Sequence, residues 1–443
     1  MHLEKGTFVM KKALYGTTAL VAAAVAAGQA DAASGLKLGI TGYYRGSIGA
    51  TFGDSNQFTR LGGGTDEGAG LYGRNNVAFR QEVRVNFTGS TTLDNGITVD
   101  VLVGLNAGGA NISGPTNAPA RINRAYMDVS GKFGQIRFGD ANSAYQSMCI
   151  GDPGNVTANF GLSSPNETFS NAGKFKGDGG TLGTYMPTAI SGAGTCFGLE
   201  TRSTKIIYFS PTFGGFNFAV SFAPDHVRSA GGSGGLGGTF GQGPVVGSKG
   251  SIFHDFLSAG VNFNHDFGGG ITLSAGVSGE WALGGKTSNT SNASGVSNKP
   301  SMYQAGFQVG FGGGWAVGAS GQYVVNYRNA GYSSFKTLST GGAISTTTDD
   351  AYMITAGGSY TVDAISVGLE GFYNHYDVSG GGPGISKAEY FGASLNAAYA
   401  LGPGISLEGQ VAWTRASNDG SGNNFDAENV DGYEIDVGTA INF

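Results

Sequence analysis

Long apolar runs are nearly absent from this chain of 443 residues, whose mean hydropathy is −0.07. A bundle of membrane-spanning helices needs repeated apolar stretches of about 20 residues, so the sequence excludes that class. Charged residues make up only 13%, whereas 82 residues are glycine. A single solid core would usually split into domains at this length, but a closed sheet grows around a lumen and escapes that limit. The composition therefore favours a β-barrel, in which half of each strand faces water.

The one apolar stretch, residues 13–27, lies near the start of the chain. Two lysines precede it and the small-residue site 30–32 (Ala-Asp-Ala) follows it, which is the pattern of a secretory signal peptide. We therefore predict that residues 1–32 are a signal peptide and that the mature chain begins at Ala33. Met10 is an alternative true start. A membrane anchor is disfavoured because about 15 residues is short for a helical span.

A basic surplus is also lacking, since the formal net charge is −6. Removing residues 1–32 removes three basic and two acidic residues, so the charge becomes −7. An acidic exported protein offers no basic surface for nucleic acid, which we exclude as a partner.

Cysteine is scarce, with Cys149 and Cys196 as the only two residues of this type. Because exported proteins meet an oxidising compartment, a disulfide between them is expected. Two unpaired thiols are the alternative.

Segments of about ten residues with alternating polarity recur along residues 33–443, which we predict to be a single β-barrel domain. About sixteen such segments are found, an even number that suits a transmembrane antiparallel barrel. They begin near residues 35, 76, 96, 121, 133, 203, 214, 255, 270, 302, 314, 350, 364, 387, 404 and 431.

The joins between these segments alternate between short turns and long loops, as in outer-membrane barrels. Long stretches rich in Gly, Ser and Asn occupy residues 51–75, 224–250, 284–300, 328–349 and 418–429. A β-sandwich would not segregate its loop lengths in this way. Closure is expected because lipid offers no partner to an unpaired strand edge.

The last predicted strand runs from Tyr433 to the carboxy-terminal Phe443. Its odd-numbered positions are mostly apolar and its even-numbered positions polar or small. At about 40° tilt its eleven residues span roughly 25 Å, the height of the apolar band on an outer-membrane barrel. An aromatic residue stands at each end of the strand.

The longest departure from the strand rhythm covers residues of about 140–202 and contains both cysteines. Segments of this length without regular structure usually have a function. We predict that it folds into the lumen as a constriction loop, with a surface cap as the alternative. The acidic residues that we assign to the constriction are Asp152, Glu167, Asp178 and Glu200.

Five arginines fall on the polar positions of the first five predicted strands, namely Arg45, Arg80, Arg84, Arg124 and Arg137. We predict that they form a basic wall facing the carboxylates of the loop. Opposed charges across a narrow pore would act on ions and polar solutes by Coulomb forces.

Signals for catalysis, cofactors and metals are weak, and we predict none of these. The segment 232–237 fits G-x-G-x-x-G but lies in a glycine-rich loop without a flanking strand and helix. The histidines show no metal-ligand spacing, so an enzyme is not predicted.

Three places give the chain a resemblance to the general diffusion porins of Gram-negative bacteria. Residues 124–139 (RAYMDVSGKFGQIRFG) resemble the family's hairpin before the inward loop, with Val129 where leucine is usual. Residues 203–216 (STKIIYFSPTFGGF) resemble the segment after it, with Thr204 and Lys205 in place of Asn and Ser. The terminal Phe443 is the third place.

This resemblance implies a sixteen-stranded homotrimer in the outer membrane, with one pore per subunit and the third loop folded inside. It also implies contact with outer-membrane lipid, lipopolysaccharide and the barrel-assembly machinery, for which Tyr433 and Phe443 would form the assembly signal. Two features depart from the family pattern, since the loop is long and its two cysteines are unusual.

The expected function is a passive channel for small hydrophilic solutes and ions. A substrate-specific outer-membrane channel is one alternative. A non-conducting barrel that serves as a structural surface protein or adhesin is the other.

Overall fold

The structure is a computed structural model, and it describes twelve segments of the chain. These segments are residues 35–53, 77–108, 121–161, 195–196, 198–200, 203–224, 253–285, 299–326, 335–339, 342–379, 386–418 and 429–443. The predicted signal peptide, 1–32, lies outside them.

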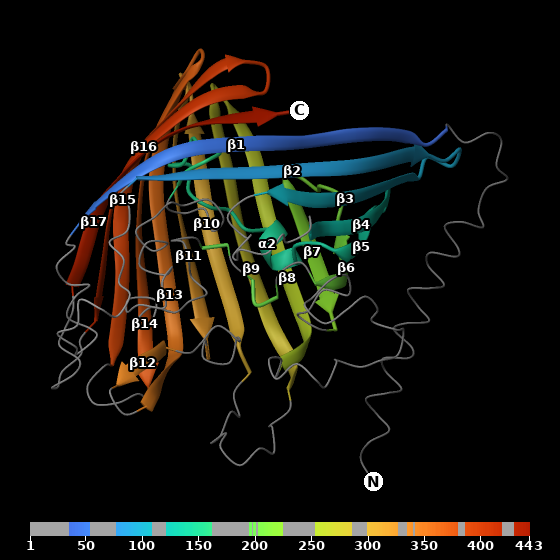
Figure 1. The fold of residues 1–443 in the computed structure, drawn as a ribbon. Coiled ribbons are helices and arrows are strands. Elements are labelled where there is room, and N and C mark those ends of the chain that lie inside the picture. The colour runs from blue at the N-terminus through green and yellow to red at the C-terminus, as the bar shows by residue number, and fades with distance from the viewer. Residues whose placement is uncertain are drawn as a thin grey trace, which may run out of the picture.

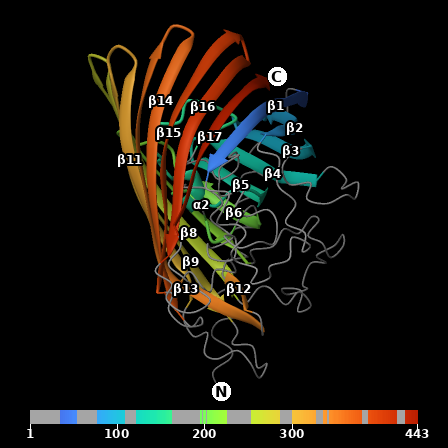
Figure 2. The ribbon, with the colours of Figure 1, turned by 60° about the vertical axis from the view of Figure 1, so that its left-hand side comes forward.

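Sixteen antiparallel strands pair side by side into a closed barrel, as Figures 1 and 2 show. The first eight strands of the ring are β1 (Lys37–Gly53), β2 (Val77–Thr92), β3 (Thr98–Gly108), β4 (Arg121–Gly131), β5 (Gly134–Asp140), β6 (Thr204–Phe209), β7 (Phe216–Ala223) and β8 (Phe253–Gly268). The other eight are β9 (Ile271–Gly285), β10 (Ser301–Phe311), β11 (Trp315–Val325), β13 (Gly342–Val362), β14 (Ile365–Ser379), β15 (Lys387–Gly402), β16 (Ile405–Asn418) and β17 (Asn429–Asn442).

The ring closes where β17 pairs with β1, which leaves no free edge facing lipid. The register places Ala440 opposite Arg45 and Tyr433 opposite Phe52. At the end of the seam, Phe443 and Gly42 exchange two backbone hydrogen bonds of 2.7 and 3.0 Å. The predicted barrel of about sixteen strands is confirmed, and the last strand is the partner of the first.

Fifteen of the sixteen predicted strand starts lie within two residues of the observed ones. The exception is β13, which begins at Gly342 rather than near residue 350 because its first residues pair with β12 (Phe335–Ser339) in a hairpin outside the ring. The prediction of a continuous loop over 328–349 is therefore wrong at this hairpin. The β13 part, Gly342–Thr348, is rich in Ser and Thr, which form strands without the apolar alternation that the sequence reading used.

Tight turns join the strands at one rim of the barrel. Gly96 adopts φ +78° and Asp363 adopts φ +51°, a left-handed backbone that short hairpin turns require. Both residues lie between consecutive strands, where the chain reverses.

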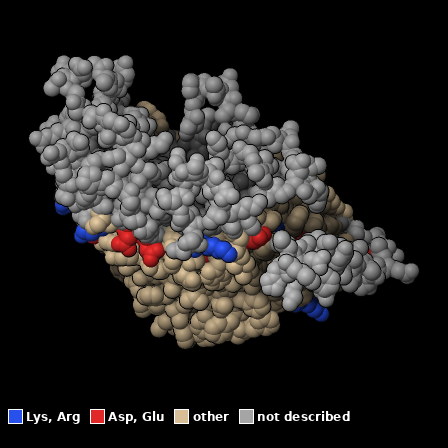
Figure 3. All heavy atoms as spheres, turned by 90° about the horizontal axis from the view of Figure 1, so that it is seen from below, with Lys and Arg blue, Asp and Glu red and all other residues tan. Residues whose placement is uncertain are grey.

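The two faces of each strand meet different surroundings. On β17, Tyr433 and Val437 are 53% and 50% exposed, whereas Glu434 and Asp436 are each 1% exposed. The exposed face is apolar on most strands, as lipid requires. In Figure 3 a broad surface without charged side chains is bordered by a row of Lys, Arg, Asp and Glu.

Candidate functional site

The inner face of the barrel is identified by the loop segment 141–161, which lies inside the ring and includes the short helix α2 (Ala144–Ser147) (Figure 1). Residues that face each other across antiparallel strands share one face of the sheet, as do residues two apart on one strand. Glu408, which binds the loop, pairs with Gly438, and Gly438 pairs with Ser47 on β1. Arg45 is two residues from Ser47 and therefore also points inward.

The outgoing arm of the loop, residues 141–161, follows the inner wall from β7 to β17. It starts at β7, where the amide of Ala144 donates to Ser221 Oγ at 3.0 Å. On β10, the side-chain amides of Gln304 and Gln308 donate to the carbonyls of Ile150 and Gly151 at 2.9 and 2.8 Å. Each of these bonds satisfies a backbone group that a buried loop would otherwise leave unpaired.

The end of this arm is bound by β15 and β16. Asn396 accepts from the amide of Val156 at 2.9 Å and donates to the carbonyl of Gly154 at 3.0 Å. Glu408 Oε2 accepts from the amides of Ala158 and Asn159 at 3.0 and 2.8 Å. A carboxylate that accepts two backbone N–H groups forms strong, charge-assisted bonds.

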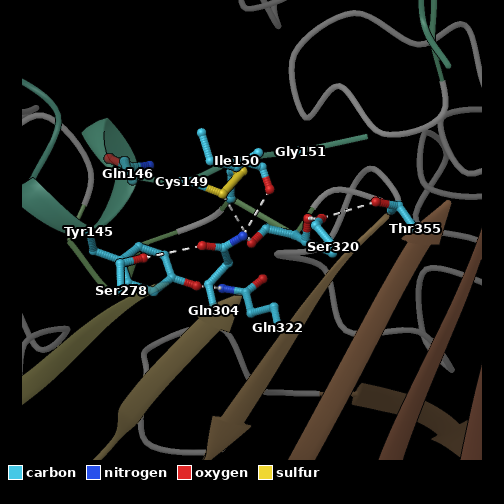
Figure 4. Close-up of a disulfide and its surroundings, with 12 residues drawn as sticks. Tyr145, Gln146, Cys149, Ile150, Gly151, Ser278, Gln304, Ser320, Gln322 and Thr355 are labelled. Carbon is cyan, nitrogen blue, oxygen red and sulfur yellow. Dashed lines mark hydrogen bonds between the residues drawn. A yellow bond between two sulfur atoms is a disulfide. The ribbon is translucent and has the colours of Figure 1, made fainter. Parts of the chain in front are cut away.

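A disulfide between Cys149 and Cys196 joins the outgoing arm to the returning arm of the loop, as Figure 4 shows. The described residues of the returning arm are 195–196 and 198–200. The two Cα atoms lie 5.7 Å apart, within the normal range for a disulfide. The returning arm is also bound to the wall, because Glu280 Oε2 on β9 accepts from the amide of Leu199 at 2.6 Å. The predicted disulfide is confirmed.

Glu200 anchors the base of the loop. Its carboxylate is 1% exposed and lies 2.8 Å from Lys205 Nζ, and it accepts from Ser203 Oγ at 2.6 Å. Burial raises the pKa of Glu200, and the Lys205 ammonium offsets this effect only in part. The lysine also donates to the carbonyl of Ala141, so both stems of the loop meet at one buried pair.

Four arginines on β1, β2, β4 and β5 form the basic wall, namely Arg45, Arg84, Arg124 and Arg137. The register places all four on the inner face. Arg45 and Arg84 both approach Glu82, at 3.8 and 3.4 Å.

The other two arginines of the basic wall have different surroundings. Arg137 forms a bidentate pair with Asp128, with N–O distances of 2.7 and 2.8 Å. Arg124 Nε, in contrast, has no hydrogen-bond partner among the described residues.

Aromatic rings support this wall. The guanidinium of Arg45 lies 4.2 Å from the ring centre of Tyr43, and that of Arg84 lies 5.0 Å from the same ring. Arg137 lies 4.0 Å from the ring of Tyr126. Such cation–π contacts fix the direction of the guanidinium groups without neutralising their charge.

The predicted acidic residues of the loop fall into two groups. Glu167 and Asp178 lie outside the described residues. Asp152 caps a turn, since its Oδ1 accepts from the amide of Gly154 at 2.9 Å, and Glu200 is buried with Lys205. The described loop carboxylates therefore hold the loop in place. Arg80 pairs with Ser47 in the register, and its side chain lies outside the described part of the structure.

Sequence reasoning missed the wall residues that bind the loop. Gln304, Asn396, Glu280 and Glu408 all occupy inward positions of their strands, as the alternation rule indicates. Alternation identifies a polar face, but it carries no information about which side chains a distant loop contacts.

A closed sixteen-stranded barrel with a loop fastened inside its lumen defines the class of β-barrel membrane channels. A comparison with sequence families matches residues 16–419 to the Gram-negative porins, and the chain belongs to this family. It is an outer-membrane diffusion channel.

Solved structures share this fold at low sequence identity. The outer-membrane channel DcaP of Acinetobacter baumannii has a TM-score of 0.51 and 14% identity, with 94% of this chain and 100% of that chain covered. An anion-selective porin from Comamonas acidovorans has a TM-score of 0.48 and 16% identity, covering 92% and 100%. No curated protein matches the sequence.

The described residues include no membrane-spanning helix and no cluster of metal-ligand type. None of their helical segments has the length and apolar character needed to cross a membrane. No group of three or more His, Cys, Asp or Glu side chains among them is placed to hold a metal ion.

Proposed function

We propose that small hydrophilic solutes and ions pass between the basic wall and the constriction loop, and that the channel prefers anions. The observation that carries the preference is the environment of Arg124, whose Nε has no hydrogen-bond partner in the described part of the chain. Next to it, Arg84 shares the carboxylate of Glu82 with Arg45. The constriction thus presents more cationic than anionic groups to water, and such a ring attracts anions.

Conductance of the purified protein in a planar bilayer tests the channel itself. We expect stepwise increases in current, and their absence would contradict the function. The sign of the reversal potential in a KCl gradient tests the anion preference separately.

Short strands on one side of the barrel favour the predicted homotrimer. Strands β5, β6 and β7 have only 7, 6 and 8 residues. A tilted strand of seven residues spans roughly 18 Å, less than the apolar band of about 25 Å. Phe138 and Met127 are nevertheless exposed on this side, which suits a neighbouring subunit better than lipid. Conductance steps that arrive in threes would support a trimer.

The proposal extends to the export, assembly and outer surface of the protein. Residues 1–32 would be removed on export, which the mass of the mature protein checks. Tyr433 and Phe443 would be read by the barrel-assembly machinery, and the outer surface would contact lipid and lipopolysaccharide. No catalytic activity is proposed.

A further inference from the structure

Seven glycines lie on the inner faces of the strands that the loop crosses, and we name them the glycine track. They are Gly260, Gly276, Gly306, Gly318, Gly357, Gly368 and Gly438. Glycine inside a strand weakens it, and it often marks a place where another backbone approaches closely.

At Gly260, Gly306, Gly357 and Gly368 the loop occupies the space that a side chain would need, and at the other three track positions the loop and a neighbouring strand share it. A Cβ on Gly260 would lie 2.5 Å from Met148 Cβ, and one on Gly276 would lie 2.9 Å from the carbonyl oxygen of Met148. On Gly306 and Gly368 the Cβ would meet the carbonyl oxygens of Ile150 and Gly154 even more closely. Real Cβ atoms essentially never come within 3.0 Å of such neighbours.

Glycines on the outer face of the same wall lack this constraint. A Cβ on Gly321 of β11 would lie 3.7 Å from its nearest neighbour, the carbonyl oxygen of Met353. On Gly371 of β14 the nearest atom would lie at 3.6 Å. Both distances are ordinary van der Waals contacts, so alanine fits at these two outer positions without displacing a neighbour.

Hydrogen bonds hold the loop down on the track. Gln304 and Gln308, which flank Gly306 on β10, bind the carbonyls of Ile150 and Gly151. Asn396, opposite Gly368 in the register, binds Gly154 and Val156. The loop therefore lies directly on the strand backbone at several points, and a side chain there would displace it towards the pore.

We infer that the glycine track sets the width of the pore, because it lets the constriction loop lie flat against the wall. This inference rests on the proposed function, since it concerns the cross-section through which ions pass. The disulfide and the bonds to Glu408 and Glu280 leave the loop tethered, so a displaced loop narrows the opening.

The test compares Gly306→Ala and Gly368→Ala with the outer-face controls Gly321→Ala and Gly371→Ala in planar bilayers. For the two track variants we expect single-channel conductance lower by roughly a third, because the pore narrows on one side. The two controls should keep the parental value. Heat-modifiable migration in gels shows whether each variant forms a barrel.

Conductance of both track variants that equals or exceeds the parental value would overturn the inference. Failure of both to fold, with both controls folded, would also overturn it, because the loop rather than the barrel should yield. A parental protein that gives no current at all would contradict the proposed function instead.

Discussion

Charged side chains have different surroundings on the basic wall and on the strands from β7 to β17 that the loop crosses, which we call the wall beneath the loop. The side chains of Arg45, Arg84 and Arg137 keep 17% to 21% of their surface exposed. On the wall beneath the loop, Glu280 and Glu408 are 0% and 4% exposed, and Glu434, on the strand β17 that pairs with β1, is 1% exposed. Exposed charges can meet passing ions, whereas at least two of the buried carboxylates, Glu280 and Glu408, position the loop.

Burying a carboxylate is costly unless hydrogen bonds replace its lost water. Glu408 meets this condition with two backbone amides, the side-chain amide of Asn159 and the hydroxyl of Ser406. The arginines of the basic wall lose less hydration, because part of each side chain is still exposed to water, so they need fewer hydrogen bonds to replace it. The net charge of the whole chain therefore does not indicate which ion the pore prefers.

Deleting Phe443 should have the largest effect, because this residue closes the seam between the two walls. Two backbone hydrogen bonds to Gly42 are lost with it. We expect most of the protein to be missing from the outer membrane, measured by fractionation. Normal insertion of this truncation would contradict the assembly role, and Phe443→Tyr is the matched control.

Removing charge from the basic wall should reduce the anion preference. For Arg84→Gln with Arg124→Gln, we expect the reversal potential in a tenfold KCl gradient to move towards the cation side by on the order of 10 mV. Arg415→Gln on β16 is the control, since Arg415 shares the outer face with Trp413. Equal shifts in both proteins would show that the position of the charge is unimportant.

Glu408→Gln should loosen the loop without changing the basic wall. The substitution removes the negative charge of the carboxylate that accepts from the amides of Ala158 and Asn159, so these hydrogen bonds become weaker. We expect the free energy of unfolding in urea to fall by about 1–3 kcal/mol and the open-channel noise to rise. Glu389→Gln, at an outward position of β15, is the control and should leave the open-channel noise unchanged. Unchanged noise in Glu408→Gln would contradict the anchoring role of Glu408.

Asp152→Asn should have the smallest effect. Its Oδ1 caps the amide of Gly154, and asparagine retains an oxygen there. We expect a change in unfolding free energy below about 0.5 kcal/mol and an unchanged reversal potential. A clear loss of cation conductance would instead place this carboxylate at the constriction.

Alternation along the strands was enough to predict the strands of the barrel and the polar face that carries Arg45, Arg84, Arg124 and Arg137, whereas closure was expected because lipid offers no partner to a strand edge. The hairpin of β12 and β13 was not predicted because its apolar residues, Phe335, Leu338 and Ile344, do not alternate regularly with polar ones. The buried contacts of Glu200 were not predicted for another reason, since Lys205 and Ala141 become neighbours only when the loop folds back. The sequence did not indicate the glycine track either, because glycine is abundant in this chain and is also common in loops and curved strands.

The sign of the reversal potential of the unmodified channel in a KCl gradient tests the contrast between the two walls most directly. Partly exposed arginines on the inner face of the barrel, together with described loop carboxylates that bind within the protein, predict a potential on the chloride side. A potential on the potassium side would contradict the account, because it would mean that acidic groups dominate the constriction.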